Sequence, residues 1–154
     1  MESMLHIGLD VGSTTAKMVV LDRNGQPIFG DYRRHNVEIK STTAEMLRIA
    51  LKKVGNGPVT IMVTGSAGLA VSSWMELPFI QEVIACNHAI ERYIPDTDVA
   101  IELGGEDAKI TFFDGTIEQR MNGTCAGGTG AFIDQMAILL GTDAQGLNEL
   151  ASRY

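Results

Sequence analysis

The sequence has few cysteines and no long apolar run. Its 154 residues include only two cysteines, Cys86 and Cys125, and they do not form a Cys-x-x-Cys motif. Two cysteines in a chain without a signal sequence more often stay reduced or bind metal than pair. No apolar run approaches the roughly 20 residues needed to cross a bilayer, and residues 1–6 lack the charged and apolar regions of a signal peptide. The sequence therefore predicts a cytoplasmic protein with no membrane-spanning segment.

Basic residues are also scarce relative to acidic ones. The chain has 12 Lys and Arg against 19 Asp and Glu, which gives a formal net charge of -7. This balance argues against nucleic acid or an anionic membrane surface as the main partner. ATP is not excluded, because backbone amides and magnesium hold phosphates locally. The apolar fraction of 45% is enough for a packed core, and the length fits about one ordinary domain, or one small domain plus part of another.

The clearest motif is IGLDVGSTTAKMVVLD, residues 7–22, in which two apolar runs flank a glycine turn. This pattern predicts a tight β-hairpin. Gly12 has no Cβ, so its backbone can approach a bulky anion and adopt a positive φ. Asp10 beside the turn can hold a metal ion through water. The amides and hydroxyls expected to face the anion belong to Ser13, Thr14 and Thr15. We interpret this segment as a phosphate-binding hairpin.

The motif occurs twice. Residues 9–17, LDVGSTTAK, align without a gap on residues 101–109, IELGGEDAK, and each copy is followed by a second turn, Asn24-Gly25 or Asp114-Gly115. Such dipeptides are strong hairpin signals. The chain is therefore predicted to contain two related β-meanders. Two copies at this separation favour a duplicated domain over a solenoid, with domains at residues 1–95 and 96–154.

Hydrophobic periodicity predicts the remaining elements. A helix over residues 44–54 is expected to start from an N-cap in Ser41-Thr42-Thr43 and to end at Gly55. The apolar run 59–63 suits a buried parallel strand. Further strands are expected at 6–10, 16–22, 27–33, 99–103, 109–114 and 116–121, and further helices at about 79–94, 129–140 and 144–153.

Two loops could bind a ligand. Residues 64–68, TGSAG, follow the parallel strand, where α/β proteins place ligands, although an ordinary connection is the favoured reading of this loop alone. Cys125 precedes a glycine-rich helix start, where amides and the helix dipole stabilise a thiolate. It could be a metal or cluster ligand, a nucleophile or an inert thiol, and no histidine is evidently placed to serve as its base. Cys86 is expected to pack in the core.

The segments LDVGSTTAKMVVLD, MVTGSAG, ELGGEDAKITFF and NGTCAGGTGAFIDQMA together resemble the activator ATPases of 2-hydroxyacyl-CoA dehydratases and the related ATPase subunits of benzoyl-CoA reductase. The resemblance implies a mixed α/β, ribonuclease H-like (actin-like ATPase) fold. It also implies cytoplasmic homodimers that hold one 4Fe-4S cluster between subunits, hydrolyse ATP with Mg²⁺, and pass an electron to an acyl-CoA dehydratase or reductase component.

Carried over by position, the resemblance assigns roles to individual residues. Asp10 would serve magnesium, Cys125 would be one cluster ligand, and Glu106 and Asp107 would order the attacking water or metal. The nucleotide-contacting positions would be Gly12, Ser13, Thr14, Thr15, Lys17, Gly104, Gly105, Gly127 and Gly128. The two turns are expected to clasp the phosphates from either side.

The sequence departs from the family pattern in two respects. Glu102 stands where the superfamily usually has Asp, and the second cluster cysteine and the adenosine motif are not in this chain, which is therefore expected to be the amino-terminal part of an activator. Two rival hypotheses remain. One is a small-molecule kinase of the same superfamily, and the other is a nucleotide-sensing or assembly module.

Overall fold

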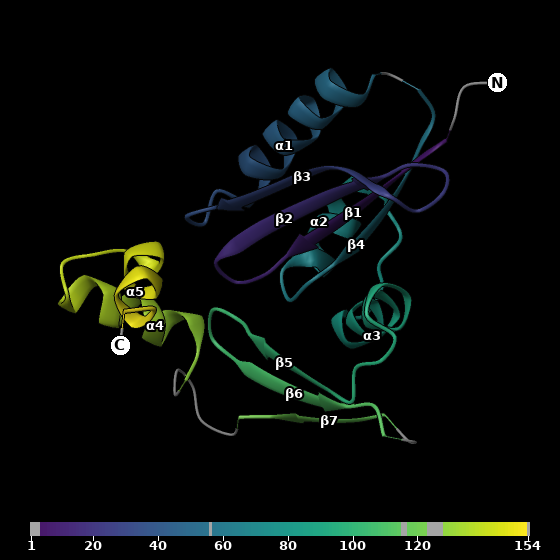
Figure 1. The fold of residues 1–154 in the computed structure, drawn as a ribbon. Helices are drawn as coiled ribbons and strands as arrows, with labels where there is room; N and C mark the ends of the chain where they lie inside the picture. The colour runs from purple at the N-terminus through teal and green to yellow at the C-terminus, as the bar shows by residue number, and fades with distance from the viewer. Residues whose placement is uncertain (1–3, 56, 115–116, 123–127, 154) are drawn as a thin grey trace. The chain divides into compact units, whose positions relative to one another are not determined.

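The computed structural model describes residues 4–55, 57–114, 117–122 and 128–153, and the chain divides into two compact units, residues 1–93 and 94–154 (Figure 1). The first unit contains β1 (Leu5–Val11), β2 (Thr15–Leu21), β3 (Pro27–Arg34), α1 (Ile39–Val54), β4 (Val59–Thr64), α2 (Gly68–Met75) and α3 (Glu82–Tyr93). The second contains β5 (Val99–Leu103), β6 (Ala108–Phe112), β7 (Glu118–Met121), α4 (Gly130–Leu139) and α5 (Ala144–Ala151).

The sheet of the first unit has the strand order β3-β2-β1-β4. Strands β1, β2 and β3 form an antiparallel meander, and β4 pairs with β1 in parallel. The predicted hairpin is confirmed, and so are the predicted strand at residues 59–63 and its parallel pairing. This strand was expected to be buried, but it lies at the edge of the sheet and only its Val63 is buried, so that part of the prediction was wrong. The register places Asp10 opposite Lys17 on β2 and beside Thr64 on β4, so these three residues lie at one end of the sheet.

One face of this sheet forms the core, because side chains alternate between the two faces of a strand. Every second residue of β1 and β2 is buried, and this face packs on both α1 and α2. The buried apolar residues of the unit are Leu5, Ile7, Leu9, Val11, Ala16, Met18, Val20, Met46, Ala50, Val63 and Val71. The packing fixes the register of the first hairpin, since a slip of one residue would expose all its apolar side chains.

Helix α1 begins earlier than the sequence predicts. Its N-cap is Glu38 rather than a residue of the Ser41-Thr42-Thr43 segment. The hydroxyls of Ser41 and Thr43 instead bond backward to the carbonyls of Glu38 (3.1 Å) and Ile39 (2.8 Å). Hydroxyl side chains make such bonds inside a helix as well as at a cap, so the predicted cap was wrong. The expected end at Gly55 is confirmed.

The segment between β4 and the domain boundary contains two helices, α2 and α3, where the sequence predicted one. Phe79, expected at the start of a helix, instead forms an isolated bridge with Val63 of β4. Helix α3 has no fully buried residue. Cys86, expected in the core, is only partly buried on this helix.

The second unit repeats the antiparallel meander of the first, with the strand order β5-β6-β7. Glu102 lies opposite Lys109 across its first hairpin, as Asp10 lies opposite Lys17. Helices α4 and α5 follow, and the carboxylate of Asp143 caps α5 by accepting the Gly146 N–H at 2.8 Å. The predicted second meander is therefore confirmed.

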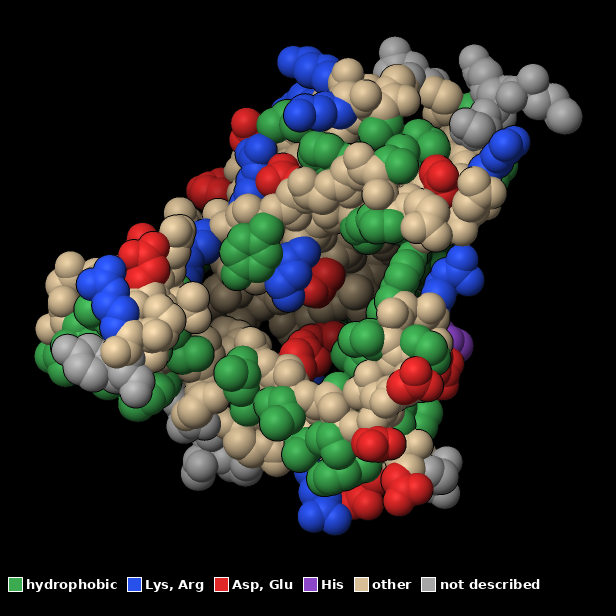
Figure 2. Space-filling model, viewed as in Figure 1, with side chains coloured by type: hydrophobic (Ala, Val, Ile, Leu, Met, Phe, Trp, Pro, Cys, Tyr) green, Lys and Arg blue, Asp and Glu red, His purple; other side chains and the backbone are tan. Residues whose placement is uncertain are grey.

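The surface combines charged and apolar side chains. On the face in Figure 2, Lys, Arg, Asp and Glu side chains are interspersed with hydrophobic ones. Among the residues that the structure describes, no helix combines the length and the apolar character that a bilayer crossing requires.

Candidate functional site

The first glycine turn closes the β1–β2 hairpin. The Gly12 N–H donates to the Thr15 carbonyl at 2.9 Å, which leaves Ser13 exposed at the tip and Thr14 partly exposed. The φ of Gly12 is not positive, contrary to the conformation that the sequence suggested. A Cβ at Gly12 would meet only the Thr15 carbonyl oxygen at 3.7 Å. The fold alone therefore does not require glycine here, and any requirement must come from a ligand.

The carboxylate of Asp10 lies next to this turn. Its Oδ2 accepts from Lys17 Nζ at 2.9 Å, in the cross-strand pair that the register dictates. The neighbouring Thr64 on β4 has a buried Oγ1 for which the described part of the chain supplies no hydrogen-bond partner. Buried hydroxyls are normally satisfied, so this end of the sheet offers both a carboxylate and an unused hydroxyl to a ligand or water.

The loop after β4, residues 64–68, packs directly on the first turn. The Ala67 N–H donates to the Val11 carbonyl at 2.9 Å. Gly65 has a φ of 94° and lies so close to Asp10 that a Cβ would be 2.5 Å from its Oδ1 and would also clash with the Val11 carbonyl. The loop is therefore more than a connection, because it forms one wall around the Asp10 carboxylate.

His35 also contacts the first turn, and sequence reasoning did not find it. It directly follows β3, and only 3% of its surface is exposed. Its Nε2 lies 3.1 Å from the Gly12 carbonyl oxygen. Its backbone N–H donates to the Thr14 carbonyl at 3.2 Å. The only available signal was a polar residue just after the strand that pairs with the hairpin.

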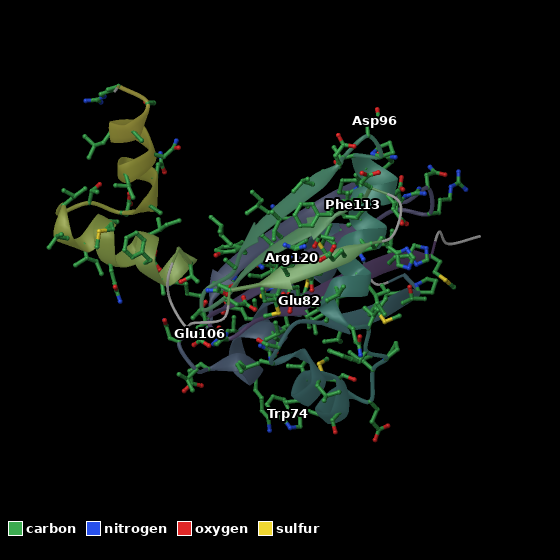
Figure 3. All side chains as sticks on the ribbon, turned by 90° about the horizontal axis from the view of Figure 1, so that it is seen from below. Trp74, Glu82, Asp96, Glu106, Phe113 and Arg120 are labelled. Carbon is green, nitrogen blue, oxygen red and sulfur yellow. The ribbon has the colours of Figure 1, made fainter. Side chains whose placement is uncertain are left out.

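The second glycine turn has the same backbone closure. The Gly104 N–H donates to the Asp107 carbonyl at 2.8 Å, and a Cβ at Gly104 would clash with the Asp107 carboxylate. Lys109 is nearly buried, and its Nζ lies 3.4 Å from Asp107 Oδ2 and 3.8 Å from Glu102 Oε1. Glu106 is exposed at this turn, at the opposite end of the meander from Asp96 and Phe113 (Figure 3).

The start of α4 is bonded to the second turn. The N–H groups of Gly130 and Ala131 donate to the carbonyls of Gly104 (2.8 Å) and Gly105 (3.1 Å). The first free amides of this helix are thus used by the protein itself. Gly128, just before the helix, is exposed and has a φ of 73°. Gly127 and Cys125, the other predicted site residues of this segment, lie outside the described residues.

The chemistry of the site is that of oxygen ligands and backbone amides. Within the described ranges, no three His, Cys, Asp or Glu residues group so as to hold a metal ion by themselves. Magnesium does not need such a cage, because it keeps several waters and usually takes one or two carboxylates plus substrate phosphates. Asp10, with the unused hydroxyl of Thr64 beside it, fits that requirement.

Comparison with known proteins agrees with this chemistry. Residues 7–153 match the BadF/BadG/BcrA/BcrD ATPase family. The chain belongs to this family. It is 29% identical over 157 residues to the 2-hydroxyisocaproyl-CoA dehydratase activator of Clostridioides difficile, a match that covers 96% of this chain and 57% of that protein. The chain thus spans little more than half the length of this family relative.

Two solved structures share the fold of this family member. Component A of the (R)-2-hydroxyglutaryl-CoA dehydratase of Acidaminococcus fermentans matches with a TM-score of 0.83 and 24% identity, over 99% of this chain and 60% of that one. The ADPNP-bound activator of the 2-hydroxyisocaproyl-CoA dehydratase of Clostridium difficile matches with a TM-score of 0.80 and 27% identity, over 98% and 57%. The predicted actin-like ATPase fold is confirmed.

Proposed function

We propose that this chain is the nucleotide-binding part of an ATP-hydrolysing activator, which passes one electron to a 2-hydroxyacyl-CoA dehydratase or a related reductase. One observation carries the proposal. Each unit builds the same turn, closed by an N–H to carbonyl bond from its glycine to the residue three positions on, at 2.9 Å for Gly12 and 2.8 Å for Gly104. In both hairpins a carboxylate stands opposite a lysine, two residues before the glycine. The family match over residues 7–153 also supports the proposal.

Both turns bind nucleotide phosphates in this proposal. The exposed Ser13 and the partly exposed Thr14 and Thr15 present hydroxyls and amides, and Lys17 adds a cation whose side chain is 49% exposed. Backbone amides in a turn of this kind bind anions well. In the second turn the proposed phosphate contacts are the backbones of Gly104 and Gly105, and Gly127 and Gly128 are further proposed contact positions.

In this proposal Asp10 would hold magnesium through water, and Glu106 and Asp107 would order the attacking water or the metal. The carboxylate of Asp10 is oriented by Lys17 on one oxygen and packed against Gly65 at the other. When bound, magnesium supplies charge neutralisation for phosphoryl transfer. Glu106 is exposed, so it is the freer of the two acids, since Asp107 already lies 3.4 Å from Lys109.

Hydrolysis by the full-length protein tests the nucleotide part of the proposal. We expect Mg²⁺-dependent release of ADP from ATP, and Asp10→Asn should lower this rate by about a hundred-fold or more, because the metal loses its carboxylate. Asp96→Asn, which changes an exposed acid at the far end of the second meander, is the matched control and should retain the rate. Equal rates in the wild type and the Asp10 variant would refute the assignment.

The same assay separates the activator from a small-molecule kinase. A kinase would release ADP only with an acceptor alcohol, whereas the activator should hydrolyse ATP in water alone. Dependence of ADP release on a sugar or small acid would therefore favour the kinase. Nucleotide binding without turnover would favour a sensing or assembly module.

Cys125 is the proposed cluster ligand, and the 4Fe-4S cluster would be shared between two copies of the full-length protein. The basis is the place of this cysteine in the sequence, in the glycine-rich segment that precedes α4, together with the affinity of cysteine thiolates for iron–sulfur clusters. Anaerobic reconstitution with iron and sulfide should give cluster absorbance at about 400 nm. Cys125→Ala should abolish it, and Cys86→Ala, on α3, should retain it. Absorbance that persists in the Cys125 variant would remove this residue from the proposal.

A further inference from the structure

His35 contacts the first glycine turn through both its ring and its backbone. The ring Nε2 lies 3.1 Å from the Gly12 carbonyl oxygen, and the backbone N–H donates to the Thr14 carbonyl at 3.2 Å. Only 3% of the surface of the residue is exposed. A residue 23 positions further along the chain thus holds two of the carbonyls of the turn.

The two ring contacts define the tautomer of His35. The Val37 backbone N–H points at Nδ1 from 3.1 Å, and an N–H can only donate, so Nδ1 carries no proton. The proton of the neutral ring is therefore on Nε2, from which it is donated to the Gly12 carbonyl. Both bonds exist only in this one form of the ring, because a protonated Nδ1 would face another donor.

The bond to Gly12 sets the direction of the next amide. A trans peptide group is planar and points its C=O and N–H in opposite directions. Because the Gly12 carbonyl faces His35, the N–H of the same peptide group, which belongs to Ser13, faces away from His35. The Thr14 carbonyl is held in the same way, and this directs the Thr15 N–H away from the His35 backbone.

The segment after His35 is strained. Asn36 and Val37 have φ values of 46° and 71°, and Val37 is 89% exposed. A β-branched residue in this region is an outlier that persists only where the surroundings fix it. The bond from the Val37 N–H to the ring fixes it here. The strained segment and the ring therefore support one another next to the turn.

We propose that His35 is a positioning residue for the phosphate-binding turn: its neutral ring, protonated on Nε2, holds the Gly12 peptide so that the Ser13 amide is presented to a nucleotide phosphate. The proposal rests on the proposed function, because it takes the anion at this turn to be a nucleotide phosphate. His35 does not touch that phosphate, and it acts through Gly12.

Two substitutions separate the two ring contacts. The amide nitrogen of Gln reaches about as far as Nε2, so His35→Gln keeps a donor for Gly12. The amide oxygen of Asn reaches only about as far as Nδ1, so His35→Asn keeps the acceptor for Val37 and loses the donor. His88→Asn, on the exposed face of α3, is the matched control.

The measurement is the Kd of a non-hydrolysable ATP analogue with Mg²⁺, by titration calorimetry on the full-length protein. We expect His35→Asn to weaken binding about five- to ten-fold, which corresponds to one lost hydrogen bond. His35→Gln and His88→Asn should stay within about two-fold of the wild type. A purely structural role would weaken both His35 variants alike, so equal losses, or no loss in His35→Asn, would overturn the proposal while the proposed function stands.

A second readout needs no nucleotide. The ¹⁵N chemical shifts of the wild-type His35 ring at neutral pH should show a neutral ring protonated on Nε2. A ring protonated on Nδ1, or on both nitrogens, would overturn the proposal even if the variants fail to fold. A wild-type protein that binds no nucleotide would instead refute the proposed function, and with it the role of His35 in binding.

Discussion

Lys17 lies directly opposite Asp10 across the first hairpin, with its Nζ 2.9 Å from Asp10 Oδ2. Lys109 occupies the equivalent place opposite Glu102 in the second hairpin, at 3.8 Å. The two lysines differ in burial, since the Lys17 side chain is 49% exposed and the Lys109 side chain is 7% exposed. Lys17 is therefore accessible to a ligand at this turn, whereas Lys109 is enclosed by the protein.

Replacing Lys17 should affect ligand binding far more than folding. An exposed ion pair contributes less than about 1 kcal/mol to stability, so Lys17→Met should change the free energy of unfolding by no more than that. The affinity for MgATP should fall, because a cation beside the first turn is lost. Urea unfolding and nucleotide titration check both parts. Lys53→Met, at the exposed end of α1, is the control and should change neither quantity by much.

Substitution of Gly65 should disturb the wall around Asp10. A Cβ there would lie 2.5 Å from Asp10 Oδ1 and would clash with the Val11 carbonyl, and the φ of 94° adds strain. Gly55→Ala is the matched control, because Gly55 has a φ of 91° and a Cβ there would have nothing within 4 Å. Strain alone should cost about 1–3 kcal/mol at either site. Gly65→Ala should lower the free energy of unfolding by about 2 kcal/mol more than Gly55→Ala does, because the added methyl group overpacks the site. Urea unfolding of both variants measures the two losses, and equal losses would contradict the clash.

The glycines of the two turns should respond differently to alanine. At Gly12 a Cβ meets only the Thr15 carbonyl oxygen at 3.7 Å, so Gly12→Ala should change the unfolding free energy by less than about 1 kcal/mol. Its nucleotide affinity should still fall, since the methyl group occupies the space that a phosphate would approach. At Gly104 a Cβ clashes with the Asp107 carboxylate, which also lies 3.4 Å from Lys109 Nζ, and would lie 3.1 Å from the Asp107 carbonyl oxygen. Gly104→Ala should therefore lose stability as well. Unfolding and binding measured on both variants check this, and an unchanged affinity in Gly12→Ala would count against a phosphate at that turn.

Local signals explain how much of the fold the sequence could predict. Alternating apolar residues and turn glycines are signals that act over a few residues. They predict both hairpins, the strand β4 and the end of α1. Helix α2 was not predicted, because its sequence, GLAVSSWM, is short and nearly all apolar or small, with no polar face. The start of α1 was misplaced because hydroxyls that serve as caps elsewhere bond to carbonyls inside this helix.

The site was predictable only where its residues are close in sequence. Asp10 and the turn after it form one motif, and the repeat identified the second turn. His35 reaches Gly12 across 23 positions, and Gly65 reaches Asp10 from another strand. The Asn24-Gly25 turn predicted that β3 pairs with β2, but it did not indicate that His35, just beyond β3, reaches Gly12. No local pattern encodes which strand β4 pairs with, and the contact of Gly65 depends on that pairing. The gapless repeat was therefore a guide to the turns and not to the residues that support them.

Relieving the strain at Val37 should stabilise the fold. Its φ of 71° suits glycine better than a β-branched residue, and its side chain is 89% exposed, so little packing is lost. Val37→Gly should raise the free energy of unfolding by about 1 kcal/mol. The same change at Val99, an exposed position of β5 with ordinary extended backbone, should lower it. Urea unfolding of both variants gives the comparison, and a loss of stability in both would show that Val37 is not strained.

Asp22 should make folding stability depend on pH. Its carboxylate accepts the backbone N–H groups of Gln26 and Asn24, each at 2.8 Å, in the turn between β2 and β3. These bonds, with Gln26 contributing most, lower the pKa of Asp22 below its ordinary value of 3.8. The folded state therefore favours the ionised form of Asp22. Its stabilising contribution to the free energy of unfolding is fully present above the unfolded-state pKa, and it is lost as the pH falls through the folded-state pKa. Asp22→Asn should lower the unfolding free energy at neutral pH, and the difference from the wild type should shrink with acidification below about pH 4. Urea unfolding of both proteins between neutral and acidic pH measures it, and a difference that grows on acidification would contradict the direction of the shift.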